Sequence, residues 1–195
     1  MKQRSIIKFR RKREGKTNYK KRLKFLQAGK PRLVIRPSLK NITAQIIEYN
    51  PQGDKTVVSV HSRELDKLGW KFNKGNIPAA YLTGVMLGKK AAEKGIKEAI
   101  LDIGLASPVK GSRAFACLKG VIDTGVKVPV SEEILPKEDR IKGDHVIKFV
   151  SVLKENQEKY SKQFSGYTKS NIDPLKITTI FEEIKNKILK GVSNA

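Results

Sequence analysis

The groups with the strongest chemical character in this sequence are the lysines and arginines of its first 30 residues. This segment holds 13 cations against one acid, Glu14, so it carries +12 of the net charge of +22. Each cation that neutralises a phosphate of a nucleic acid releases condensed counterions, and this release favours binding. So dense a cluster of cations is therefore suited to a nucleic-acid partner. Ile6, Ile7 and Phe9 offer too little apolar surface to fold the segment alone. We therefore predict a basic, extended N-terminal arm over residues 1–30 that binds a polyanion.

The arm offers phosphate contacts between Arg10 and Lys24, and Tyr19 is expected to stack on a base. The cations concerned are Arg10, Arg11, Lys12, Arg13, Lys16, Lys20, Lys21, Arg22 and Lys24. Two alternatives stay open for the arm: a solvated basic tail without a specific partner, and a targeting presequence. The presequence fits less well, because no apolar stretch follows the charges and Ser5 is the only serine in the arm.

Further candidate RNA contacts follow the arm. Lys30, Arg32 and Arg36 accompany the first predicted strand and are expected to touch phosphates. Residues 70–76 interleave aromatic and cationic side chains in a loop, as base-stacking segments do. Trp70 either stacks there on a base or fills the core beneath the loop. The second-rank candidates are Lys40, Asn41, Lys71, Lys74, Lys110, Ser112 and Arg113.

The last three of these candidates lie at the start of a predicted helix over residues 112–124. A helix start presents free backbone N–H groups and the positive end of the helix dipole, which favour an anion. The chain has no GxxxxGK[ST] match, so this is not a nucleotide P-loop. The helix start is therefore either a phosphate contact or an ordinary capped terminus.

Apolar alternation predicts the elements that position these groups. Residues 32–36 form a strand with Leu33 and Ile35 inward and Arg32 and Arg36 outward. Runs over 42–49 and 56–60, separated by turn residues, add two strands. Three consecutive strands with short turns make an antiparallel meander. A short helix over 63–68, capped by Ser62 and ended by Gly69, follows it.

Helices dominate the rest of the chain. A long helix runs from about residue 76 to 94, and the stripe that includes Gly84 and Gly88 predicts a close approach to the sheet. A fourth strand spans 98–103, and helices are expected over 143–163 and 173–189. The fold class is thus α/β: a three-stranded antiparallel meander plus a further strand packed against helices, with a C-terminal helical extension. We divide the chain into an arm (1–30), an α/β core (31–130) and the extension (131–195), whose acidic segment 131–139 faces solvent or a basic protein neighbour.

A nuclease is the enzymatic alternative. The predicted βββαβα order begins like a ribonuclease-H layout, and Asp102 would end the fourth strand where a metal-binding carboxylate belongs. No acid stands at the matching end of the first strand, and Glu93 lies at the far end of the long helix. His61 and His145 are far apart in the sequence and do not indicate a Cys/His metal site. We predict no catalytic residue, no metal and no cofactor.

Composition sets the remaining limits. The 195 residues suffice for one α/β domain with an appendage, and 38% hydrophobic residues can support a core. The longest mostly apolar stretch, 77–88, is shorter than the about 20 residues that span a bilayer. The single cysteine, Cys117, excludes an internal disulfide and fits a reducing compartment. We expect an intracellular protein with no membrane contact.

Three ordered stretches resemble a known family, the 5S rRNA-binding large-subunit ribosomal proteins numbered eighteen, in their long archaeal/eukaryotic-type form. The matching residues are 17–23 and 29–34 in the first stretch, 61–65, 69–70 and 75–84 in the second, and 101–105 and 110–116 in the third, with 132–136 and 143–145 beyond them. No single motif is decisive, but the ordered set is specific and spans about residues 8–190.

The resemblance implies a structural constituent of the cytoplasmic ribosome. It implies binding to 5S rRNA, attachment of 5S rRNA to the large-subunit rRNA in the central protuberance, and ribosomal protein neighbours that include the other 5S-binding protein. RNA is favoured over DNA mainly by this resemblance, since both present phosphates. The alternative is a general nucleic-acid-compacting or chaperone protein without 5S specificity.

Overall fold

Four strands form one mixed sheet in the computed structural model, which describes residues 7–191, and their spatial order is β3-β2-β1-β4. β1 (Arg32–Pro37), β2 (Ile42–Glu48) and β3 (Lys55–His61) are antiparallel neighbours, as predicted. β4 (Ile100–Asp102) is shorter than predicted and pairs in parallel with β1. The carboxyl ends of β1 and β4 therefore meet at one edge of the sheet.

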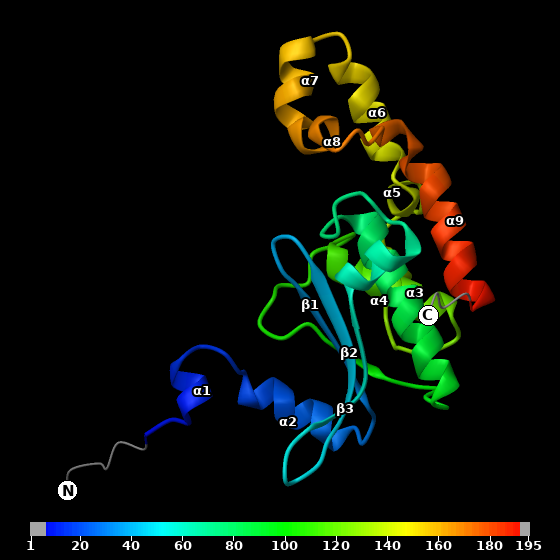
Figure 1. Ribbon diagram of the computed structural model, residues 1–195. Helices are drawn as coiled ribbons and strands as arrows, with labels where there is room; N and C mark the ends of the chain where they lie inside the picture. Colours follow the sequence, from blue (N-terminus) through cyan, green and yellow to red (C-terminus); the bar gives the residue numbers. More distant parts are fainter. Residues whose placement is uncertain (1–6, 192–195) are drawn as a thin grey trace, which may run out of the picture.

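Two helices cover one face of this sheet (Figure 1). α3 (Ile77–Glu93) and α4 (Arg113–Asp123) pack there on the inward side chains, including Leu33 and Ile35, which are fully buried. The two inward positions predicted from the alternation are confirmed. Asn76 caps α3, because its side chain accepts a hydrogen bond from the backbone N–H of Ala79 at 2.9 Å.

The glycine stripe of α3 lies against α4 and not against the sheet as predicted. A Cβ at Gly84 would overlap the carbonyl oxygen of Cys117, and one at Gly88 would overlap the hydroxyl of Thr124. A Cβ at Gly120 of α4 would likewise overlap the carbonyl oxygen of Tyr81 in α3. The small residues thus let the backbones of α3 and α4 approach each other. The sequence periodicity predicted a close contact but could not show which element makes it.

The helix after the meander is the 3₁₀ helix η1 (Ser62–Leu68), and its cap differs from the prediction. His61 is the N-cap: its Nδ1 accepts from the N–H of Arg63 at 3.2 Å, while Glu64 accepts from the N–H of His61 at 2.8 Å. The hydroxyl of Ser62 instead accepts from the backbone of Ile42 at 3.0 Å, which ties η1 to β2. Gly69 ends the helix with a left-handed φ of 97°.

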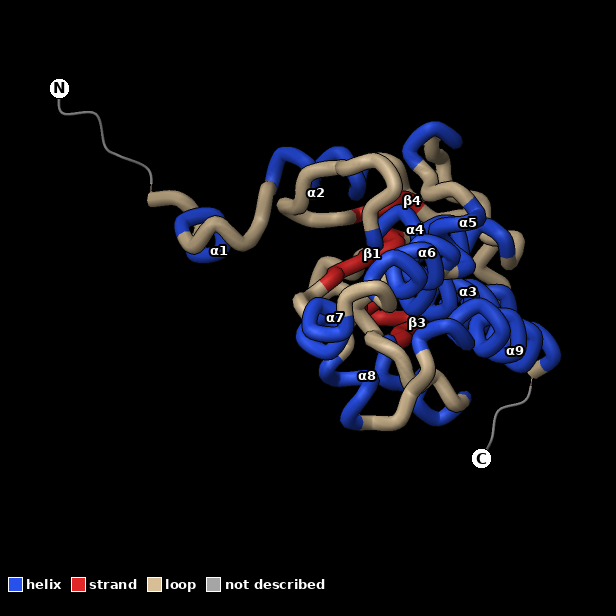
Figure 2. The backbone as a smooth tube through the Cα atoms, turned by 90° about the horizontal axis from the view of Figure 1, so that it is seen from above, coloured by secondary structure: helices blue, strands red, loops and turns tan. Residues whose placement is uncertain are grey.

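The C-terminal extension consists of short helices and one long one. They are η2 (Glu132–Ile134), α5 (Glu138–Lys142), α6 (Asp144–Leu153), α7 (Gln157–Gln163), α8 (Ser165–Lys169), η3 (Pro174–Lys176) and α9 (Ile177–Lys190). The single helix predicted over 143–163 is interrupted, because Asn156 caps a new helix by accepting from the N–H of Lys159. The apolar stripe of α9, including Phe181 and Ile184, is buried and belongs to the core. Figure 2 shows α9 on the far side of α3 from the strands.

The arm contains two helices, so it is less extended than predicted. They are α1 (Arg10–Arg13) and α2 (Tyr19–Gln27), and Asn18 caps α2 through the N–H of Lys21 at 3.1 Å. α1 nevertheless projects away from the sheet in Figures 1 and 2, whereas α2 lies beside the end of the strands. Among the described residues, no helix combines the length and the apolar character needed to cross a membrane.

Candidate nucleic-acid interface

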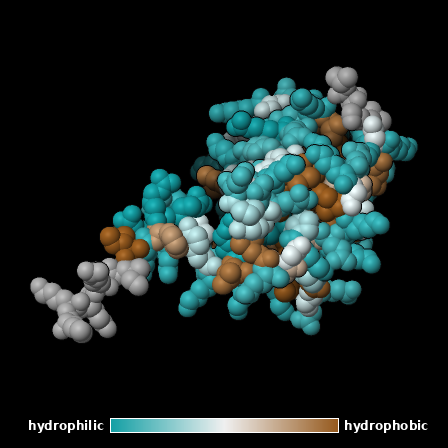
Figure 3. Space-filling model, turned by 90° about the horizontal axis from the view of Figure 1, so that it is seen from below, coloured by the Kyte–Doolittle hydropathy of each residue, from teal (hydrophilic) through white to brown (hydrophobic). Residues whose placement is uncertain are grey.

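The cations of the arm face solvent. Seven of them are exposed and form no ion pair within residues 7–191: Lys8, Arg11, Lys12, Arg13, Lys20, Lys21 and Lys24. Glu14, the one acid of the arm, lies 3.7 Å from Arg10 and 2.9 Å from Lys16. Figure 3 shows hydrophilic surface over most of the arm beside the body of the molecule. The arm therefore presents positive charge that the rest of the chain does not neutralise.

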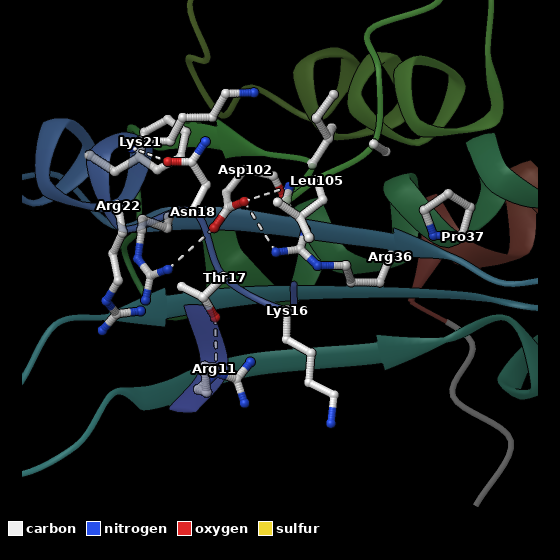
Figure 4. Close-up of a pocket in the computed structure, with 15 residues that line it drawn as sticks. Arg11, Lys16, Thr17, Asn18, Lys21, Arg22, Arg36, Pro37, Asp102 and Leu105 are labelled. Atoms are coloured by element: carbon white, nitrogen blue, oxygen red, sulfur yellow. Dashed lines mark hydrogen bonds and ion pairs between the residues drawn. The ribbon is translucent and has the colours of Figure 1, made fainter. Parts of the chain in front are cut away.

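Arg11 and Tyr19 are engaged within the arm. The Nε of Arg11 donates to the hydroxyl of Thr17 at 2.9 Å, a bond drawn in Figure 4. The ring of Tyr19 packs on that of Phe9, with 5.2 Å between centroids. These contacts hold α1 close to the start of α2, so the two helices form one basic unit.

A chain of ion pairs connects this unit to the sheet. It runs through Arg22, Asp54, Arg32, Asp102 and Arg36, and we call it the ion-pair chain. Asp54 accepts from Arg22 of α2 at 2.9 Å and from Arg32 of β1 at 2.5 Å. Asp102 of β4 lies 3.2 Å from Arg32 and 3.1 Å from Arg36. Asp54, from the β2–β3 turn, thus joins the arm to the core.

The electrostatics of Asp54 favour this link at neutral pH. Burial alone would raise the pKa of Asp54, but the hydrogen bond from Arg22 and the charges of Arg32 and Arg22 outweigh burial. The pKa of Asp54 therefore lies below its ordinary value. Asp54 stays ionised, and Arg22 stays in place.

A hollow of about 410 Å³ lies where the arm passes the sheet. Its walls carry Lys16, Lys21, Arg22 and Arg36, together with the loop that follows β4. Figure 4 shows Arg36 and Asp102 facing each other in it, joined by a dashed line. Asp102 is the only acid in the lining of the hollow, and its carboxylate already accepts from Arg36, Arg32 and the N–H of Gly104. The hollow can hold an anion such as a phosphate.

Two predicted contacts are corrected by the structure. The side chain of Arg32 is only 6% exposed because it lies between Asp54 and Asp102, so it orients the surface and does not reach phosphate. Trp70 is 1% exposed, and its Nε1 donates to the carbonyl of Asn73 at 3.3 Å. Trp70 is part of the core, as in the alternative considered for it, and cannot stack on a base.

The other predicted residues beyond the arm, Lys30 apart, fall into two places. Lys40, Asn41, Lys71 and Lys74 line a common groove at the end of the sheet. Lys110, Ser112 and Arg113 lie at the start of α4, and there the guanidinium of Arg113 donates to the carbonyls of Ser38 and Gly75 at 2.8 and 3.0 Å. Lys110 pairs with Glu133 at 3.3 Å, and Lys30 pairs with Glu98 at 2.6 Å. Because its guanidinium donates to the carbonyls of Ser38 and Gly75, Arg113 holds two loops together, and a phosphate contact would be an additional role.

Sequence reasoning missed Asp54, Asn18 and Arg63. Asp54 stands in an Asn-Pro-Gln-Gly-Asp turn and was assigned to turn chemistry only. Its partners lie 22 and 32 residues away, on a strand and in the arm, and no local pattern links them. The feature that identifies Asp54 as a functional residue is its position beside the basic arm, and this position exists only in the folded chain.

Among residues 7–191, the carboxylates do not gather into a metal centre. Asp102, the residue on which a nuclease would depend, has its oxygens occupied by two arginines and a backbone N–H. Within the part of the chain that the structure describes, no three His, Cys, Asp or Glu side chains are grouped so as to hold a metal ion.

The fold and this surface together describe an α/β protein with a cationic arm tethered to its sheet, a distribution of charge that suits a polyanionic partner. The family model described as ribosomal large subunit proteins 60S L5 and 50S L18 matches residues 3–98 and 89–131. The chain belongs to this family, and its place is therefore the large subunit of the ribosome, where it is an rRNA-binding component of the translation machinery. The resemblance noted in the sequence is confirmed at the level of the family.

Proposed function

We propose that this chain binds 5S rRNA and helps attach it to the large-subunit rRNA in the central protuberance, as a structural component without catalysis. The observation that carries the proposal is the set of exposed arm cations held against the sheet by Arg22 and Asp54. The family match supports an rRNA partner. The 5S component rests on the resemblance of the ordered motifs.

In this proposal the arm and the hollow contact different phosphates of the RNA. Cations on α1 and α2 contact phosphates along the RNA, while Arg36, Lys16 and Lys21 contact a phosphate that enters the hollow. Because the ion-pair chain fixes the arm in advance, less ordering is needed when RNA binds. Tyr19, half-buried against Phe9, keeps an exposed part for base contact.

Protein neighbours are part of the proposal. The exposed acids of the 131–139 segment, including Glu132 and Asp139, give the otherwise basic surface a negative face. Such a face suits a basic ribosomal protein in the same particle. The other 5S-binding protein is the neighbour that the resemblance suggests.

A general nucleic-acid-compacting protein is the second candidate, because phosphate contacts alone carry no sequence information. Competition separates the two. Labelled 5S rRNA bound to the full chain is challenged with unlabelled 5S rRNA, tRNA and duplex DNA. The proposal expects tRNA and DNA to compete at concentrations about 100-fold or more higher than 5S rRNA. Equal competition by all three would establish the second candidate instead.

A further inference from the structure

A second cationic groove lies between the core and the extension, away from the arm. Its volume is about 530 Å³. One wall comes from the β1–β2 turn and the loop before α3, and the other from the end of α7, α8 and the turn that follows. Figures 1 and 2 both place α8 far from α1 and α2. An RNA segment lying along the arm would therefore leave this groove open.

The groove carries the chemistry that RNA backbones require. Lys40, Arg63 and Lys71 are exposed and have no ion-pair partner among the described residues. Lys74 also lines the groove but pairs with Asp66 at 2.6 Å. Between the cations stand amide and hydroxyl groups that can bond sugars and base edges: Asn41, Asn73, Gln163 and Ser170.

The two walls are locked together by an aromatic series that starts in the core. The ring of Trp70 lies 5.2 Å from that of Phe72, and Phe72 lies 5.9 Å from Tyr167 of α8. The hydroxyl of Tyr167 accepts from the backbone N–H of Asn73 at 3.2 Å. The extension thus has a fixed position on the core loop, and the groove is formed before any ligand arrives.

We propose that this groove binds a single-stranded RNA segment distinct from the one held by the arm, so that the extension is half of an RNA-binding site. The inference rests on the proposed function, since it assumes an rRNA partner for the arm, and it adds where a second RNA segment is bound. An acidic peptide is the competing ligand. RNA is favoured because amides, hydroxyls and the partly exposed ring of Tyr167 stand among the cations, whereas an acidic peptide needs charge alone.

The test uses the full chain with 5S rRNA bound and a second, differently labelled single-stranded RNA of mixed sequence as the probe. The groove variant is Lys40→Gln, Arg63→Gln and Lys71→Gln combined. The control variant, Lys97→Gln, Lys127→Gln and Lys187→Gln, removes the same charge from exposed positions outside both surfaces. Thermal unfolding of each variant confirms that it is folded.

The probe is expected to bind the wild-type complex and the control variant alike. The groove variant should lose more than about tenfold in probe affinity, and its salt dependence should fall by about 2 in slope, since each single-strand phosphate contact contributes about 0.7. Its affinity for 5S rRNA should not change. Because the two labels are read separately, failure of 5S binding and failure of the groove are distinguishable.

Three results would overturn the inference. The wild-type complex could fail to bind the probe, or the groove variant could bind the probe as tightly as wild type. Polyglutamate could also displace the probe from the wild-type complex as effectively as unlabelled RNA of equal charge. The last result would identify the groove as a docking site for an acidic protein.

Discussion

Asp54 orients the arm, because its carboxylate accepts hydrogen bonds from arginines on two different elements. Asp54→Asn removes the charge that compensates Arg22 and the nearly buried Arg32. We expect this change to lower the free energy of unfolding by about 1–3 kcal/mol, since hydrogen bonds to charged groups are lost and a guanidinium is left poorly paired. Urea denaturation at neutral pH measures it. Glu14→Gln is the control, because its ion pairs are exposed and worth little.

The same variant gives a pH test. The pKa of Asp54 is lower in the folded chain than its ordinary value of 3.8, so its contribution to stability is present above that value and is lost as pH falls through the folded pKa. The difference in unfolding free energy between wild type and Asp54→Asn should therefore shrink on acidification below about pH 4. A difference that is absent at pH 7, or constant down to strong acid, would show that Asp54 does not hold the arm.

Cys117 is expected to be inert in the folded protein. It is fully buried in α4, and burial raises the pKa of its thiol to about 12. Because the thiolate is the reactive form, Ellman's reagent should react at neutral pH only as fast as the core opens. Rapid reaction in urea serves as the positive control. A comparable rate in buffer alone would mean that the contact between α3 and α4 is far looser than described.

Residue identity predicted the charged surface well but not the role of each cation. Alternation correctly placed Arg32 on the outer face of β1, yet it could not show that Asp54 and Asp102 cover it there. The sequence was equally undecided about Trp70, because its aromatic and cationic neighbours are compatible both with a base-stacking loop and with a side chain that fills the core. In both cases the deciding atoms come from residues distant in the sequence.

At the scale of elements, the contact between α3 and α4 depends on glycines. Gly84→Ala would place a Cβ onto the carbonyl oxygen of Cys117, a backbone atom that cannot move without its helix. We expect a loss of about 3 kcal/mol in the free energy of unfolding.

The matched control for this prediction is Gly166→Ala in α8, where nothing lies within 4 Å of the added Cβ. Alanine is the better helix former by about 0.5–1 kcal/mol, so this variant should be as stable as wild type or more so. Chemical denaturation of both variants measures the contrast. Equal stability of the two would contradict the close approach of the helices.

Elements with a strong periodic pattern could be predicted, and those defined by distant contacts could not. The three meander strands and α3 follow from alternation, turn residues and the Asn76 cap. The parallel pairing of β4 with β1 depends on a crossover through η1 and α3, which no local pattern encodes. The break before α7 depends on one capping asparagine within an otherwise helical run.

At the scale of the whole molecule, the basic surface has two separated parts on one rigid core. The arm lies at one end of the sheet and the groove beside α8 at the other (Figure 1). α9 packs on α3, and Lys89 of α3 donates to the carbonyl of Ile188 at 2.8 Å, which fixes the end of the extension. This arrangement suits a protein that holds two RNA segments at a set separation.

The salt dependence of 5S rRNA binding tests the central claim most directly. The arm variant replaces Lys12, Arg13, Lys20, Lys21 and Lys24 with Gln; the control replaces Lys97, Lys127, Lys148, Lys159 and Lys187. If the arm cations contact phosphates, the slope of log affinity against log salt should fall by about 4–5 in the arm variant, at about 0.9 per contact, and stay unchanged in the control. Equal slopes and equal affinities in all three proteins would contradict the account.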